Sequence, residues 1–310
     1  MTGGSKLKRI ISCMLALTVF VSVCCSCVAE KTNKDKILLV ASFYPVYIFT
    51  LNIVDDIPEF SVECMAEQNV GCLHDYQLLS KDARLISDSD AFIINGAGME
   101  EFLEDVYISV DDIKVIDSSK NVEVIEECHE EHHEADEHHH HSVNSHIWMS
   151  VKNAIVQCEN IATELSQLYP QYKEEIDKNK SEYIERLENL NEELELKSEK
   201  IKGKNIITFH ESFDYLANDY SFNVLAKVES HEGGEPSAKS LAELTETIKE
   251  NNVTVLFVEP DYKGSAATIL SNETGVQICM LNPVINGENS LTAYEDIMRG
   301  NMSAILEKVN

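Results

Sequence analysis

The chain has 310 residues, of which 44% are hydrophobic, so it can bury the core of two ordinary domains or of one large domain. Its formal net charge at pH 7 is −29, and so acidic a surface argues against nucleic acid and anionic lipid as partners. The same charge suits the attraction of cations, although solubility alone explains it better.

The N-terminus has the order of parts that is typical of an export signal. Three basic side chains within residues 6–9 are followed by the apolar residues 10–23 and then by small residues. The apolar run is shorter than the ~20 residues that a membrane-spanning helix needs. We therefore expect a cleaved signal peptide rather than a spanning anchor.

The apolar run ends in cysteines, which resembles the signal of a bacterial lipoprotein. Cleavage of such a signal leaves a lipidated cysteine. We expect this to be Cys27, which follows a small residue, with Cys24 or Cys25 as alternatives. The protein would then be extracytoplasmic and lipid-anchored to the bacterial cell membrane, with residues 27–36 as a polar tether. Residues 1–26 hold three cations and no acidic residue, so their removal changes the net charge from −29 to −32.

In residues 37–127, predicted strands alternate with helical or loop segments, as is typical of an α/β lobe. Residues 37–43 are continuously apolar, as expected for a strand that is buried on both faces of a parallel sheet. Pro45 then stands where the first turn of a helix tolerates proline. Three further short apolar runs read as strands: residues 60–66, 90–98 and 113–119. The pattern predicts an N-terminal lobe with a mainly parallel sheet.

Residues 128–145 form an acidic, histidine-rich segment whose low hydrophobicity predicts a flexible loop. Seven of the chain's eleven histidines stand there among acidic residues: His129, His132, His133, His138, His139, His140 and His141. They are too redundant for one defined site. Two interpretations remain open, weak auxiliary capture of metal ions and an inert solvated loop.

Residues 146–202 are predicted to be a linking helical segment, because residues 151–200 contain no glycine and are broken only by Pro170. The part after Pro170 has dense charge and a stripe of apolar side chains at helical intervals. This stripe consists of Ile176, Tyr183, Ile184, Leu187, Leu190 and Leu194. It predicts a long, half-exposed helix.

Residues 203–310 repeat the pattern of the first lobe. Residues 205–212, 253–260 and 276–284 read as strands, and residues 237–252 as an amphipathic helix with Leu241, Leu244 and Ile248 on one face. The sequence thus predicts an α/β fold of two pseudo-symmetric lobes with mainly parallel sheets, joined by one long rigid helix. Ligands of such folds bind at the carboxyl ends of strands, here in the cleft between the lobes.

Three histidines outside the run stand at the boundaries of predicted elements. His74 follows a glycine-containing turn, His146 precedes the helical segment, and His210 lies at the carboxyl end of a predicted strand. Imidazole is the commonest neutral zinc ligand, and three imidazoles plus one further group complete a tetrahedron. Spacing alone is a weak signal, because no two of them share one short motif. The cysteines beyond the signal region are scattered without a CxxC pair, so a thiolate site is not expected.

Several segments together resemble a known family in their order and spacing. They are "SFYPVYIF", "GCLHDYQLLSKDARLISDSDAFIINGAGMEEFL", "NSHIWMS", "FHESFDYLA" and "EPSAKSLAELTETIKENNVTVLFVEP". The family is that of the metal-specific substrate-binding lipoproteins of ABC importers, in particular its zinc-binding, ZnuA-like branch. The resemblance covers nearly all of the chain after the signal.

The resemblance implies that His74, His146 and His210 are metal ligands. Manganese receptors of the group carry a carboxylate at the third position, whereas a histidine there fits the preference of zinc for nitrogen. The fourth position holds Asn282 where many relatives have aspartate, so water could be the fourth ligand. Glu259 could hold that water or orient a histidine, or it could merely pack or cap.

The implied function is capture of Zn²⁺ and its delivery to the permease of an ABC importer, by a monomer that is not an enzyme. The histidine run would then add auxiliary zinc capture. A manganese or iron receptor of the same fold is the first alternative. A zinc hydrolase is another, but the sequence offers no HExxH motif on a predicted helix. An adhesin with an incidental metal is a third.

Overall fold

The computed structural model describes residues 36–66, 76–103, 106, 113–127, 142–228 and 235–309. The expected signal peptide, the lipidation residue Cys27, the ligand candidate His74 and the seven histidines of the run lie outside the described residues. Within the described ranges, no helix is both long enough and apolar enough to cross a membrane.

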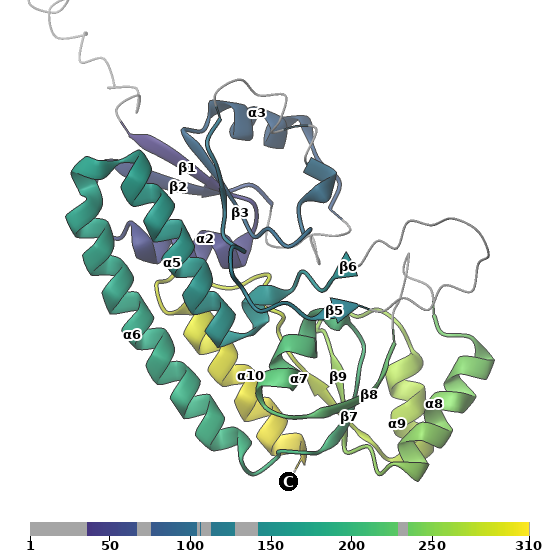
Figure 1. Ribbon diagram of the computed structural model, residues 1–310. Helices are drawn as coiled ribbons and strands as arrows, with labels where there is room; N and C mark the ends of the chain where they lie inside the picture. Colours follow the sequence, from purple (N-terminus) through teal and green to yellow (C-terminus); the bar gives the residue numbers. More distant parts are fainter. Residues whose placement is uncertain are drawn as a thin grey trace, which may run out of the picture. The chain divides into compact units, whose positions relative to one another are not determined.

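Among the described residues, the N-terminal sheet contains four parallel strands in the order β2-β1-β3-β4. Its strands are β1 (Ile37–Ala41), β2 (Phe60–Cys64), β3 (Ala91–Ile94) and β4 (Val115–Asp117), and its helices are α2 (Tyr44–Ile53) and α3 (Ser80–Asp88) (Figure 1). All four residues of β3 are buried, as the apolar run predicts for a central strand. Pro45 lies in the first turn of α2, as expected.

The C-terminal sheet is also parallel, in the order β10-β9-β7-β8. Its strands are β7 (Asn205–Thr208), β8 (Asn223–Lys227), β9 (Val255–Val258) and β10 (Gln277–Met280). Its helices are α7 (Asp214–Asp219), α8 (Ala238–Glu250), α9 (Ala266–Thr274) and α10 (Ala293–Val309) (Figure 1). The predicted fold of two α/β lobes with parallel sheets is confirmed. Strand β8 was not predicted, because this edge strand alternates between exposed and half-buried residues.

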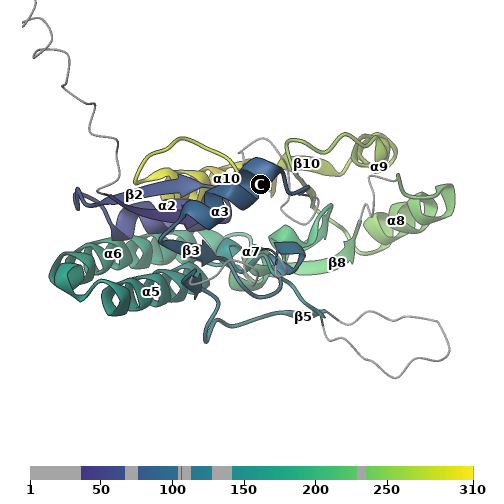
Figure 2. The ribbon, with the colours of Figure 1, turned by 90° about the horizontal axis from the view of Figure 1, so that it is seen from above.

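The linking segment forms two helices, α5 (Val151–Leu168) and α6 (Lys173–Ser198), which lie side by side in both views (Figures 1 and 2). Between them Tyr169 leaves the helical conformation, and Pro170 starts a single 3₁₀ turn, Pro170–Tyr172. Proline cannot continue the hydrogen-bond ladder of a helix, so the chain reverses there. The long half-exposed helix predicted after Pro170 is α6.

The apolar stripe of α6 packs into the main core. Ile176, Tyr183, Leu187, Leu190 and Leu194 are buried, and Ile184 is half-buried. On the same helix, the Arg186 guanidinium lies 4.8 Å from the centre of the Tyr183 ring, and its Nε lies 3.2 Å from Glu295 Oε1 of α10. The ion pair with Glu295 ties α6 to the C-terminal helix.

A short antiparallel pair forms the base of the histidine-rich segment. Strand β5 (Glu126–Glu127) pairs with β6 (Ser142–Val143), with Glu126 opposite Val143. The Tyr215 hydroxyl joins this base to α7, because it accepts the N–H of Ile125 at 3.1 Å and donates to the carbonyl of Asn144 at 2.6 Å. The sequence did not predict this pair.

Leu190→Ala should lower the free energy of unfolding by ~2–5 kcal/mol, because it opens a cavity in the core beside α6. Leu196→Ala is the matched control, since Leu196 lies on the same helix with 75% of its surface exposed. That change should cost less than ~0.5 kcal/mol. Urea unfolding of both variants measures the difference, and equal losses would contradict the buried stripe.

Candidate metal centre

The segment around His146 is held between the two sheets. Trp148 is fully buried, and its indole N–H donates to the carbonyl of Pro283, after β10, at 2.8 Å. Its ring meets that of Phe43, at the start of α2, edge to face with the centroids 4.8 Å apart. Its own carbonyl accepts the Tyr294 hydroxyl of α10 at 2.9 Å. These contacts with both lobes fix the backbone next to His146.

The N-terminal lobe holds this segment through a buried polar network. Asn95, after β3, donates from its amide to the carbonyl of Ser145 at 2.9 Å and accepts from Gln157 of α5 at 3.0 Å. Glu100 accepts the Asn95 backbone N–H at 2.8 Å and the Ser42 hydroxyl at 2.7 Å. Burial raises the pKa of Glu100 to about 7, and these hydrogen bonds oppose the rise.

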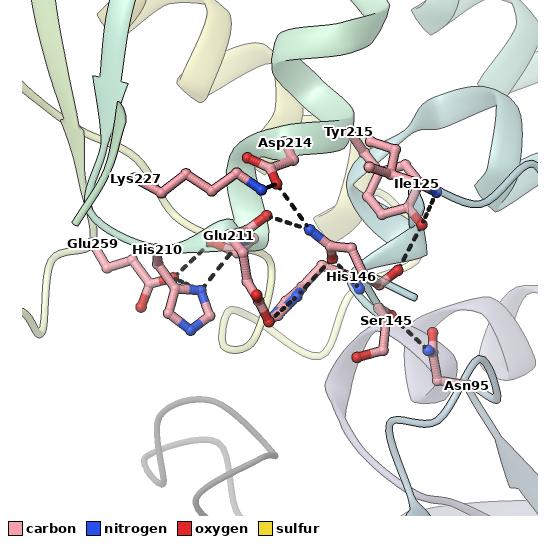
Figure 3. A network of polar contacts seen from close by, with 12 residues as sticks. Asn95, Ile125, Ser145, His146, His210, Glu211, Asp214, Tyr215, Lys227 and Glu259 are labelled. Carbon is pink, nitrogen blue, oxygen red and sulfur yellow. Dashed lines mark hydrogen bonds and ion pairs between the residues drawn. The ribbon is translucent and has the colours of Figure 1, made fainter. Parts of the chain in front are cut away.

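His146 is 1% exposed, and Asn144 contacts both its backbone and its ring. The Asn144 side-chain oxygen lies 3.0 Å from the backbone nitrogen of His146 and 3.1 Å from its Nδ1. The Asn144 amide nitrogen donates to the carbonyl of Glu211 at 2.9 Å and to Asp214 Oδ2 at 3.2 Å. The Lys227 ammonium pairs with the same Asp214 oxygen (Figure 3).

His210 follows β7, and its ring lies edge to face with that of His146, with the centroids 4.9 Å apart. His210 Nδ1 accepts the backbone N–H of Ser212 at 3.1 Å and lies 3.3 Å from Glu259 Oε1. The same carboxylate oxygen accepts the Ser212 hydroxyl at 2.8 Å. Thus two imidazoles from distant parts of the sequence come together at the carboxyl ends of β7 and β9 (Figure 3).

Two carboxyl groups flank the imidazoles. Glu211 Oε1 lies 3.7 Å from His146 Nδ1, and Glu259 is beside His210. Burial raises the pKa of Glu259 from 4.5 to about 7; the hydrogen bond from Ser212 opposes this, and Asp261 adds to it. A cation nearby would favour the ionised carboxylate, so the pair can balance positive charge when metal is bound.

Asn282, the candidate for the fourth position, holds the turn after β10. Its side-chain oxygen accepts the backbone N–H of Val284 at 2.8 Å, and its amide nitrogen lies 3.2 Å from the carbonyl of Asn286. Val284 has a φ of 62°, a conformation that needs such local support. Its role as a ligand stays a prediction.

In the part of the chain that the structure describes, His146 and His210 come together, but no group of three metal-ligating side chains is complete. The third predicted histidine, His74, lies outside the described residues. Asn144 was not singled out from the sequence as a partner of His146. Its position two residues before a histidine was the available signal, because Asn side chains often bond two residues onward.

The fold consists of two α/β lobes, each with a parallel sheet, that are connected through a long helix. Together with imidazoles at the carboxyl ends of strands, this architecture defines the class of two-lobed solute-binding proteins. Within this class, the chain belongs to the family ZnuA, zinc-uptake complex component A, periplasmic, whose model matches residues 39–308. The resemblance seen in the sequence is confirmed.

Curated relatives show the same likeness. The chain is 31% identical over 307 residues to the zinc-binding lipoprotein AdcA of Streptococcus pneumoniae (strain ATCC BAA-255 / R6), covering 97% of this chain and 60% of the relative. It is 31% identical over 291 residues to the high-affinity zinc uptake system protein ZnuA of Bacillus subtilis (strain 168), covering 91% of this chain and 90% of the relative. The chain therefore spans about 60% of the length of the AdcA relative.

Solved structures agree. A crystal structure of ZnuA matches with a TM-score of 0.76 at 25% identity, over 89% of this chain and 100% of that chain. The Zn(II)-bound AdcA from Streptococcus pneumoniae matches with a TM-score of 0.73 at 30% identity, over 88% of this chain and 58% of that chain.

Glu259→Gln should make the metal-free protein more stable than the wild type as pH rises. The pKa of Glu259 is about 7 in the folded state against 4.5 as its ordinary value, so the folded chain binds more protons between these pH values. The wild type therefore loses stability from about pH 4.5 to 7, and the variant lacks this loss. The gain should reach at most about 3 kcal/mol at pH 8.

Urea unfolding at pH 5 and pH 8 measures this gain. Glu188→Gln, which removes an exposed carboxyl from α6, corrects for the general effect of one charge. A gain for Glu259→Gln that does not change between the two pH values would show that the carboxyl is ionised at both.

Proposed function

We propose that this chain is an extracytoplasmic receptor that captures Zn²⁺ and delivers it to an ABC-type membrane importer. The observation that carries the proposal is the contact of His146 with His210, 4.9 Å apart between ring centroids, in a chain of the ZnuA family. Two of the similar proteins are named for zinc binding and zinc uptake. Their names support zinc as the cargo.

We assign His74, His146 and His210 as the ligands of the cargo ion. Three neutral nitrogen donors suit zinc, whereas manganese prefers more oxygen ligands. The fourth position would hold water or Asn282. Glu259, beside His210 Nδ1, would orient that imidazole and supply negative charge outside the ligand shell.

We assign no catalytic step to this site. A receptor must release its ion to the next protein, so a neutral ligand set with charge held outside it suits binding and release. A zinc hydrolase would need a substrate pocket beside an open metal position and a general base directed at the bound water. The family description names an uptake component, which supports binding rather than catalysis.

We place the protein outside the cytoplasm, as a monomer anchored by lipid on Cys27, with the permease of the importer as its partner. The word lipoprotein in the name of the AdcA relative supports the anchor. We keep the predicted division of the chain: residues 1–26 signal, 27–36 tether, 37–127 first lobe, 128–145 loop, 146–202 linking segment and 203–310 second lobe.

Single replacement of His74, His146 or His210 by alanine should weaken the tightest zinc site by more than the ~10–100-fold that loss of an outer partner costs. Competition with a chromophoric chelator measures the affinity. His231→Ala is the matched control, because His231 is a histidine outside both the run and the proposed set. Wild-type affinity in all three variants would sink the ligand assignment.

Replacement of residues 128–141 by a glycine-serine linker of equal length should lower the number of zinc ions bound and leave the tightest site in place. The equal length keeps β5 and β6 paired, so a change cannot come from loss of that base. Zinc titration of both proteins by calorimetry gives the stoichiometry. If the tightest site is lost, the run supplies a ligand and is not auxiliary.

A further inference from the structure

We propose that Asn144 is a positioning residue that holds His146 in the tautomer with the proton on Nδ1, so that Nε2 carries the lone pair for the metal. The inference rests on the proposed function only in taking Zn²⁺ as that metal. It assigns a role to a side chain that was not among the site residues predicted from the sequence.

The orientation of the Asn144 amide is determined by its surroundings. Its nitrogen faces two acceptors, the carbonyl of Glu211 at 2.9 Å and Asp214 Oδ2 at 3.2 Å. Its oxygen faces a donor, the backbone N–H of His146 at 3.0 Å. The flipped amide would set oxygen against two oxygens and N–H against N–H, so the network admits one orientation.

This orientation of the Asn144 amide determines the tautomer of the His146 imidazole. Asn144 Oδ1 can only accept a hydrogen bond, so His146 Nδ1 at 3.1 Å from it must donate. Glu211 Oε1, 3.7 Å from the same nitrogen, favours the same proton position. In a neutral imidazole with its proton on Nδ1, Nε2 is the nitrogen that can bind a metal.

The second lobe reinforces the arrangement from two further directions. Asp214 is 6% exposed, and the Lys227 ammonium pairs with the oxygen that faces the Asn144 amide, which offsets the cost of burying that carboxylate. The Tyr215 hydroxyl donates to the backbone carbonyl of Asn144 at 2.6 Å. The side chain and the backbone of Asn144 are therefore both held by the second lobe (Asp214, Tyr215 and Lys227 are labelled in Figure 3).

The nature of the side chain at residue 144 should decide the tautomer. Asn144→Leu keeps the approximate size but removes the acceptor from Nδ1. Asn144→Asp keeps an acceptor toward Nδ1 but loses the donor toward Glu211 and Asp214. Asn153→Leu is the matched control. Asn153 is 5% exposed, and the change removes one hydrogen bond from its side-chain amide to a backbone carbonyl, that of Glu123.

The test combines two measurements on the chain without its signal peptide. Nitrogen-15 NMR of the zinc-free protein, at a pH where the ring is neutral, reports which nitrogen of His146 is protonated, with His146→Ala identifying the signal. Chelator competition gives the zinc affinity. We expect the Nδ1–H form in the wild type and in Asn144→Asp, and a shift toward the Nε2–H form in Asn144→Leu.

Zinc affinity should fall ~10–100-fold in Asn144→Leu and stay within about threefold of the wild type in Asn144→Asp and Asn153→Leu. An Nε2–H form in the wild type overturns the proposal even if the leucine variant does not fold. So does an Asn144→Leu protein with wild-type affinity, or an equal loss in Asn153→Leu. A wild type that does not bind zinc tightly would instead refute the proposed function and leave the tautomer measurement standing.

Discussion

The site depends on the burial of Trp148, which holds the segment that carries His146 against both lobes. An indole that is fully buried must satisfy its N–H, and here the partner is the carbonyl of Pro283 in the second lobe. The edge-to-face contact with Phe43 brings in the first lobe. Because the segment cannot shift without breaking both contacts, His146 two residues earlier has a defined position relative to both sheets.

Each lobe also holds one of the two residues before His146. Ser145 is held by Asn95 from the first lobe, and Asn144 by Asp214 and Tyr215 from the second. Buried polar groups are costly unless every partner is in place, so such networks admit few alternative arrangements. Gly96, next to Asn95, has a φ of 77°, and a Cβ there would lie 2.0 Å from Asp117 Oδ1. The loop that carries Asn95 therefore requires glycine.

The electrostatics of the site combine neutral ligands with nearby acids. The imidazoles of His146 and His210 bring no negative charge, while Glu211 and Glu259 stand beside their Nδ1 atoms. Burial, which raises the pKa of Glu259 to about 7, reduces the negative charge of the metal-free site near neutral pH. A dication would reverse this preference. The acidic chain as a whole, with a net charge of −29, adds a general attraction for cations.

The sequence by itself determined the elements whose burial is continuous or periodic. The apolar runs of β3 and β9 and the stripe of α6 identify them, because strand and helix periods are local properties of the chain. It also determined the family, through motifs spread over nearly its whole length. His74, outside the described residues, remains a prediction from that resemblance alone.

Only the tertiary structure revealed the features that depend on contacts between residues far apart in the sequence. Strand β8 was missed because an edge strand with one exposed face has no apolar run. The fold-back of α5 on α6 and the contact of His146 with His210 join parts of the chain that no local period relates. The role of Asn144 required Asp214 and Lys227, since the orientation of an amide depends on its partners in space and not on its neighbours in sequence.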